Sequence, residues 1–313
     1  MREHNYRINN YKVLASQFRK SNPYKAILFY ERAYSCSGEN KEIELLFEMA
    51  LLYDELDEDE KAEEKYYEIL NIIPTEERAY YGLAILYDKK EEYNKAIEFF
   101  QEAIKLNPQY HKAFFFMANT YDQMGNKDKA IEYYKKALEI KENDFWTYIN
   151  LGAIYEEINE NQKALKMIEK AMELDPEHYI VHFNMGVVYG KLGRLEEAEL
   201  HYKNSLVINP KYPYSYLNLA VLHKEQKDYA KAREVISEGI NNVPDASFLY
   251  YNRACILVHL QELDDALVDL LQATKLSPGL IEYMEKDEEL DEIKKLRGYR
   301  LAFGKRNEIT RAD

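Results

Sequence analysis

The chain has few of the residues that interrupt helices. Among 313 residues there are 11 glycines and 8 prolines, whereas 46% are apolar. This balance is typical of a helix-rich chain with short connections. The two cysteines, Cys36 and Cys255, stand far apart, so we expect reduced thiols in a cytosolic protein. No stretch approaches about eighteen uninterrupted apolar residues, and the first residues lack the apolar core of a secretory signal. We expect a soluble, cytoplasmic protein without membrane insertion.

Basic residues are in excess only at the two ends of the chain. Residues 1–32 and 294–313 each carry seven basic and two acidic side chains, although the formal net charge of the chain is −14. An acidic body disfavours nucleic acid as a partner, because phosphates bind basic surfaces. The most acidic run is YDELDEDEKAEEK, residues 53–65. It is typical of a solvated turn, although it would also suit a basic partner.

The chain is rich in internal repeats. In residues 179–212, apolar residues recur at three-to-four spacing on both sides of Gly193, which predicts two amphipathic helices joined by a tight turn. A proline recurs at intervals of 34 residues or twice that number, at Pro74, Pro108, Pro176, Pro210, Pro244 and Pro278. Because neither helix can bury its apolar stripe alone, copies of this hairpin must stack on one another.

Two further columns share this period. Small residues occupy Ala62, Ala96, Ala130, Ala164, Ala198, Ala232 and Ala266. Aromatic residues occupy Tyr53, Tyr87, Tyr121, Tyr155 and Tyr189, and the column breaks at His223 and Leu257. Small side chains allow close approach of helices, and rings fill the space between hairpins.

The pattern resembles the tetratricopeptide repeat (TPR). Within residues 179–212 the matching residues are Met185, Gly186, Tyr189, Gly193, Ala198, Tyr202 and Pro210. The resemblance covers roughly nine-tenths of the chain. It implies an all-α fold, a right-handed superhelical solenoid of about eight antiparallel helical hairpins with a C-terminal capping helix.

The repeats divide the chain into a solenoid over residues 1–280 and a capping helix with a basic tail over residues 281–313. The predicted repeats span about residues 7–42, 43–76, 77–110, 111–144, 145–178, 179–212, 213–246 and 247–280. The first is degenerate, because SGEN stands where the proline is expected. Such atypical repeats are common at the ends of solenoids.

An asparagine occupies the sixth position of four consecutive repeats. The four are Asn150, Asn184, Asn218 and Asn252. In this family the first helix of each hairpin lines the concave surface, and similar ladders line the repeats of protein O-GlcNAc transferases. The resemblance therefore implies that these amides hold the backbone of an extended peptide, since each offers a donor and an acceptor. The alternative is that they cap or bridge within the hairpin.

Apolar residues and a row of acids accompany this ladder. The expected apolar lining comprises Trp146, Ile149, Phe183, Val187, Tyr214, Leu217, Val221, Phe248 and Tyr251. Exposed aromatic surface of this kind marks partner sites, although some of these side chains would suit packing between repeats. The twelfth position carries Asp54, Asp88, Asp122 and Glu156, which would favour a ligand bearing lysine or arginine.

No pattern indicates catalysis. His178 and His182 are four apart and could share a helix face, but no third metal ligand accompanies them, so a packed histidine is favoured. Gly186, Gly190 and Gly193 lie in a helix and its turn rather than after a strand, so they form no phosphate loop. We find no nucleophile with an evident base and no cofactor fingerprint. We expect no enzyme, no metal and no cofactor.

The sequence therefore predicts a non-catalytic adaptor or scaffold that binds an extended segment of a protein partner in its concave groove. The asparagine ladder would hold the backbone, the apolar lining would supply affinity, and the acids would favour basic segments. One alternative is a self-assembling scaffold, in which basic ends meet the acidic second repeat of a neighbour in a homo-oligomer. Another is the recruitment subunit of a separate enzyme, such as a glycosyltransferase.

Overall fold

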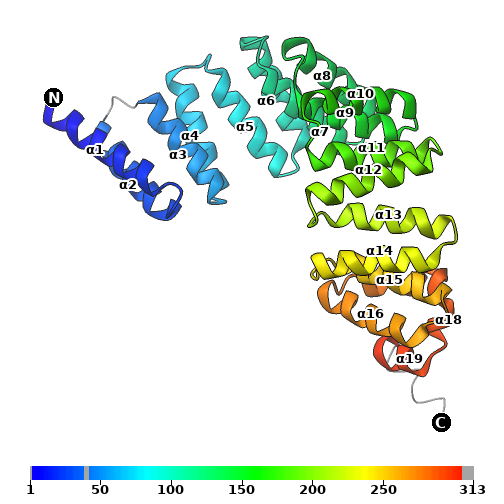
Figure 1. Ribbon diagram of the computed structural model, residues 1–313. Coiled ribbons are helices and arrows are strands. Elements are labelled where there is room, and N and C mark those ends of the chain that lie inside the picture. The colour runs from blue at the N-terminus through cyan, green and yellow to red at the C-terminus, as the bar shows by residue number, and fades with distance from the viewer. Residues whose placement is uncertain (1, 39–41, 305–313) are drawn as a thin grey trace. The chain divides into compact units, whose positions relative to one another are not determined.

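All regular structure in the described part of the chain is helical (Figure 1). The computed structural model describes residues 2–38 and 42–304, which form nineteen α-helices and one 3-10 helix. The first sixteen helices follow one another as hairpins: α1 (Arg2–Phe18) and α2 (Pro23–Ser37), α3 (Ile43–Glu55) and α4 (Asp59–Ile72), α5 (Glu77–Lys89) and α6 (Tyr93–Leu106), α7 (His111–Gln123) and α8 (Lys127–Ile140), α9 (Phe145–Glu157) and α10 (Asn161–Leu174), α11 (Tyr179–Lys191) and α12 (Leu195–Ile208), α13 (Pro213–Glu225) and α14 (Tyr229–Asn242), α15 (Ser247–His259) and α16 (Leu263–Leu276).

The turn inside each hairpin from the second to the eighth contains a residue with positive φ. Glycine fills this place at Gly125 and Gly193, with φ of 75° and 73°. Elsewhere the same conformation is adopted by Asp57, Glu91, Asn159, Lys227 and Gln261. An L-residue with a side chain pays an energetic cost in the left-handed region, so the packing of the two helices must enforce the turn where glycine is absent.

The two repeated columns form the core. Every alanine of the small column is fully buried, and the five tyrosines of the aromatic column are at most 9% exposed. Neighbouring hairpins also pack on one another, as the contacts of α2 with α3, α4 with α5 and α12 with α13 show. The expected stacking of hairpins is confirmed, and it leaves the first helix of each hairpin with a face that the second helix does not cover.

Two compact units divide the chain, residues 1–147 and residues 148–313. The N-terminal unit contains the hairpins from α1 to α8, and the C-terminal unit contains those from α11 to α16 together with α10. The boundary falls within α9. Below, the surface formed by the first helices of consecutive hairpins within one unit is called the first-helix face.

The segment after the last hairpin is not the single capping helix that the sequence predicts. It consists of α17 (Leu280–Lys286), η1 (Glu288–Leu290), α18 (Asp291–Lys294) and α19 (Arg297–Phe303). In one continuous helix, residues six apart such as Met284 and Leu290 would lie about 120° apart around the axis. The break at Asp287, whose side chain accepts a hydrogen bond from the Glu289 N–H, allows both to be buried.

Two predicted segments, the first repeat and the basic tail, match the described structure only in part. The first helix begins at Arg2, earlier than the predicted start of the first repeat at residue 7. Residues 39–41 of that repeat and residues 305–313 of the predicted basic tail lie outside the described residues. Within the described ranges, no helix combines the length and apolar character that crossing a membrane requires.

Candidate functional site

The asparagine ladder lies on the first helices of the C-terminal unit. Asn184, Asn218 and Asn252 sit in α11, α13 and α15, and Asn150 belongs to α9. All four are partly buried. Each occupies the same register of its helix, so the predicted repetition of position is present in the structure.

Asn184 and Asn252 are held in the same way. The side-chain amide of Asn184 donates to the Ile180 carbonyl at 2.8 Å, and that of Asn252 donates to the Phe248 carbonyl at 2.8 Å. Both bonds run to the carbonyl four residues earlier in the same helix. Within the described part of the chain, the Oδ1 atoms of these two asparagines accept no hydrogen bond. Each amide therefore keeps an acceptor and one N–H for a ligand.

Asn218 contacts the preceding hairpin instead. Its side chain lies near the Tyr202 hydroxyl, and Tyr202 is almost fully buried. Burial raises the pKa of Tyr202 to about 12, so the hydroxyl stays protonated. The Tyr202 ring also occupies the space beside Gly186, where an added Cβ would lie 2.6 Å from the ring. Of the four ladder asparagines, Asn218 therefore contacts the neighbouring hairpin.

Aromatic side chains lie next to the ladder on these helices. Tyr214 stacks on Phe248 with ring centroids 5.2 Å apart, and Phe183 packs on Tyr212 at the same separation. Tyr214 is 49% exposed, and Phe183 and Leu217 are partly buried. The predicted lining residues Phe183, Tyr214 and Leu217 therefore stay at the surface of the C-terminal unit.

Two residues of the predicted lining are placed differently. Tyr251 is only 7% exposed, and its hydroxyl donates to Asp287 of the segment after the last hairpin. It does not contribute to an open surface. Trp146 is 50% exposed but belongs to the N-terminal unit, as do Asp88 and Asp122. These three residues therefore do not belong to the surface of the C-terminal unit.

The acidic row at the twelfth position is mostly neutralised by lysines of the chain. Asp54 pairs with Lys89 at 3.3 Å, and Asp122 pairs with Lys127 at 2.7 Å. In the C-terminal unit, Glu156 pairs with Lys191 at 3.2 Å. Asp88 differs, because among the described residues it has no cationic partner and accepts instead from the Thr120 hydroxyl at 2.6 Å.

The acidic run at residues 53–65 is compensated in a similar way. Lys89 lies within 2.9 Å of carboxylate oxygens of both Asp57 and Asp59, and Lys90 pairs with Glu63 at 2.9 Å. These pairs reduce the field that would attract the basic ends of another molecule. The head-to-tail assembly considered from the sequence gains no support from this turn.

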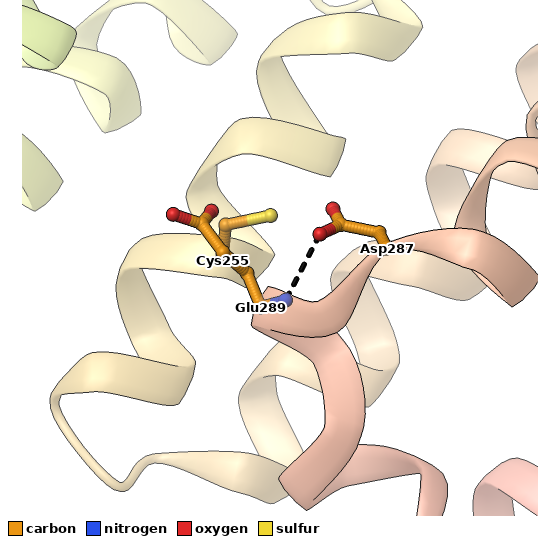
Figure 2. Close-up of side chains that lie close together, drawn as sticks. All are labelled: Cys255, Asp287 and Glu289. Carbon is orange, nitrogen blue, oxygen red and sulfur yellow. Dashed lines mark hydrogen bonds between the residues drawn. The ribbon is translucent and has the colours of Figure 1, made fainter.

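One group of side chains has the composition of a metal site. Cys255, Asp287 and Glu289 lie together where α15 meets the segment after the last hairpin (Figure 2). Burial raises the pKa of the Cys255 thiol to about 12, so it stays protonated at neutral pH. Asp287 accepts from Tyr251 and from the Glu289 N–H, and Glu289 pairs with Lys224 at 2.8 Å. The group has its own partners and joins this segment to the last two hairpins.

Lys224, which pairs with Glu289, is not among the residues predicted from the sequence. Lys224 occupies the twelfth position of its repeat, where four earlier repeats carry an acid. This reversal of charge in the sequence could have indicated that Lys224 has a different partner. Because Lys224 and Tyr251 both bind the segment 287–289, the first-helix face is covered by the chain itself at its last hairpin.

The histidine pair considered from the sequence is not a chelating pair. The His178 Nδ1 atom accepts from the Ile180 N–H at 3.2 Å, at the start of α11. His182 faces His201 of α12 instead, with their Nδ1 atoms 3.1 Å apart. The two histidines that are four apart in sequence therefore engage different partners.

The hairpins match the models of a known protein family. Family models described as tetratricopeptide repeat match residues 77–110, 111–144, 179–212, 133–166, 201–234 and 249–279. The chain belongs to the tetratricopeptide repeat family. Proteins built of these repeats mediate protein–protein interactions and are typically non-catalytic. A comparison with curated proteins finds no match.

Solved structures share the tetratricopeptide fold at low sequence identity. A tetratricopeptide repeat protein from Parabacteroides merdae is 17% identical, with 75% of this chain and 93% of that chain covered and a TM-score of 0.63. The APC/C hetero-tetramer Cut9–Hcn1 gives 16% identity over 92% of this chain and a TM-score of 0.60. The alignment spans only 58% of that chain. At these identities the likeness establishes the fold alone.

Proposed function

We propose that the protein is a non-catalytic adaptor that binds an extended segment of a partner protein on the first-helix face of its C-terminal unit. Asn150, Asn184, Asn218 and Asn252 contact the backbone of that segment. The neighbouring aromatic and aliphatic side chains bury its apolar groups.

The observation that carries this proposal is the repeated geometry of Asn184 and Asn252. Two side chains, two repeats apart, make the same intrahelical bond at 2.8 Å. A bond of this kind restricts the rotamer before any ligand arrives, so less side-chain entropy is lost on binding. The unpaired Oδ1 atoms are suited to accept from backbone N–H groups, which every peptide has irrespective of sequence.

The surroundings of the ladder supply apolar surface. The stacked rings of Tyr214 and Phe248 keep their arrangement without a ligand, and Tyr214 is half exposed. Burial of such a ring contributes roughly 1–2 kcal/mol at about 25 cal/mol per Å² of apolar area. Amides that hold the backbone and rings that bury side chains together describe a site of broad sequence tolerance.

The test is whether affinity depends on backbone N–H groups. Binders to the full-length protein are selected from a random peptide library, and the best peptide is resynthesised with N-methyl groups at alternate residues. N-methylation removes the donors that the Oδ1 atoms accept, so we expect at least a tenfold loss of affinity in fluorescence anisotropy. The variant with all four ladder asparagines changed to alanine should bind the unmodified peptide as weakly.

A matched control uses asparagines on second helices. The control variant carries Asn71→Ala, Asn94→Ala, Asn204→Ala and Asn241→Ala, from α4, α6, α12 and α14. It has the same number of changes and should retain full affinity. Unchanged affinity of the ladder variant, with its helicity intact by circular dichroism, would overturn the proposed role of the asparagines.

A further inference from the structure

A pocket of about 380 Å³ opens on the first-helix face of the N-terminal unit. Its apolar lining comes from α3, α4, α5 and α7, namely Phe47, Leu51, Tyr66, Tyr81, Ile85 and Phe116. All the residues that line it lie between positions 44 and 116, so the pocket belongs to one unit. The sequence-based predictions include Asp88 of this unit among the acids that favour a basic ligand, but they include no pocket.

The ladder position carries no asparagine in the repeats that line this pocket. Gly82 occupies that position in α5, and Glu48 and Phe116 occupy it in the flanking repeats. The Tyr66 ring fills the place of the missing side chain, since a Cβ at Gly82 would lie 2.3 Å from Tyr66 Cζ. An aromatic ring without an amide beside it offers apolar contact rather than backbone hydrogen bonds. The pocket is therefore suited to a side chain.

The charged groups at its edge already have partners. Glu44 accepts from Arg78 at 2.9 Å, Asp54 from Lys89 at 3.3 Å, and Glu48 from Arg19. A charged side chain in the pocket would compete with these pairs and would lose its hydration. The pocket consequently favours a large uncharged side chain, either aromatic or branched aliphatic.

Asp88 lies one turn of α5 beyond the lining residue Ile85 and has no cationic partner among the described residues. The two residues share a face of α5, and the Thr120 partner of Asp88 follows Phe116 by one turn of α7. Burial raises the pKa of Asp88, whereas the hydrogen bond from Thr120 favours the ionised form. No cationic side chain among the described residues pairs with Asp88. A cation brought by a ligand would therefore offset the cost of burying its charge.

We propose that the pocket and Asp88 form a second recognition site, which binds a large apolar side chain of a protein partner together with a neighbouring lysine or arginine. We choose this occupant because Asp88 is the one acid of the twelfth-position row that has no cationic partner among the described residues. A basic side chain of the ligand would complement its charge. The site does not depend on the asparagine ladder, which lies in the other unit.

The probes are fluorescein-labelled nine-residue peptides of glycine and serine that carry one phenylalanine and one lysine two residues apart, in either order. Matched peptides carry glutamate for lysine or alanine for phenylalanine. We expect the full-length protein to bind one phenylalanine–lysine order about five- to tenfold tighter than its glutamate counterpart, because a half-buried charge pair contributes to that extent. Replacement of phenylalanine by alanine should weaken binding similarly.

Variants of the protein test the roles of Asp88 and of the pocket. Asp88→Asn should abolish the preference for lysine over glutamate, and Asp88→Lys should invert it. Leu51→Arg should weaken all phenylalanine peptides, and because Leu51 is 44% exposed the substitution does not disturb the core. The matched control is Asp122→Asn at the same register of the next repeat, where Lys127 already neutralises the acid, and it should retain the preference.

Equal binding of lysine and glutamate peptides, an Asp88→Asn variant that keeps the preference, or no binding of any peptide would each overturn the proposal. The four-alanine ladder variant is measured alongside. It should bind these short peptides as the native protein does. Loss of the ladder function and loss of the pocket function are therefore separable.

Discussion

The Nε2 atom of His223 lies 4.0 Å from a carboxylate oxygen of Glu199, at the same two repeat positions that Tyr87 and Glu63 join by a hydrogen bond of 2.6 Å. His223 is 1% exposed, and its Nε2 atom has no hydrogen-bond partner among the described residues. The imidazole is too short to reach an acceptor that a phenol reaches elsewhere in the same column.

We therefore predict that His223→Tyr stabilises the C-terminal unit by about 1 kcal/mol, since it adds a buried hydrogen bond and removes an unsatisfied nitrogen. The neighbouring position that Phe99 fills beside Tyr87 is occupied by the smaller Val235, which leaves space for the larger ring. Urea unfolding followed by far-UV circular dichroism measures the effect. His223→Phe is the control for volume, and equal stabilisation by Phe and Tyr would exclude the hydrogen bond to Glu199.

Two glycines within first helices should respond to alanine in opposite directions. At Gly82 the new Cβ would meet the Tyr66 ring at 2.3 Å, whereas at Gly190 no atom lies within 4 Å. We expect Gly82→Ala to destabilise the protein by about 1–3 kcal/mol through overpacking. Gly190→Ala should stabilise it by up to about 1 kcal/mol, because alanine loses less backbone entropy. Thermal unfolding of both variants checks the contrast, and a shift of the same sign in both would contradict it.

The repeat period predicted the hairpins because it is a property of many residues at once. The turns illustrate this, since Lys227 and Gln261 adopt the left-handed conformation that Gly193 adopts easily. No local signal at those two residues favours such a backbone. Their position in the repeat predicts it, because packing of the flanking helices determines the turn.

The site was less predictable, because a repeat position does not specify its neighbours. Tyr251 shares its column with Phe183 and Leu217, yet the segment after the last hairpin covers it. Asp88 and Asp122 likewise share a column but differ in charge compensation. Here the sequence did contain a signal, because Lys127 follows Asp122 by five residues and Tyr93 follows Asp88 by the same interval.

Two ion pairs in neighbouring hairpins should differ in their contribution to stability. Arg253 donates to both oxygens of Asp269 at 2.7 Å, and Asp269 is 4% exposed. Arg233 donates to both oxygens of Glu262 at 2.7 and 3.0 Å, but these side chains are 43% and 36% exposed. Removal of one charge from a buried pair leaves the other uncompensated, whereas an exposed pair contributes little.

We expect Asp269→Asn to destabilise the C-terminal unit by about 2–4 kcal/mol and Glu262→Gln by less than about 1 kcal/mol. Urea unfolding of the two variants in parallel measures the difference. Raising the salt concentration should affect the contribution of Glu262 more than that of Asp269, because buried pairs are screened less. Equal losses in the two variants would show that burial of Asp269 is not the deciding factor.

The contact between His182 and His201 predicts a pH dependence of stability. His182 Nε2 lies 3.0 Å from the Pro176 carbonyl, which can only accept, so this nitrogen carries the proton. The Nδ1 atom of neutral His182 must then accept from His201 Nδ1, 3.1 Å away. Burial and the nearby His182 lower the pKa of His201 to about 4, although the charge of Glu197 opposes the shift.

A histidine whose pKa is lower in the folded than in the unfolded state favours folding while it is neutral. Its contribution is complete above about pH 6.5, the value of an unfolded histidine, and is lost as the pH falls towards 4. We predict that acidification from pH 7.5 to 4.5 destabilises the native protein by about 2 kcal/mol more than the His201→Asn variant. Asparagine can donate to His182 but does not titrate. Because His111 and His223 are present in both proteins, their protonation cancels in the comparison, and parallel pH profiles would exclude His201 as the source.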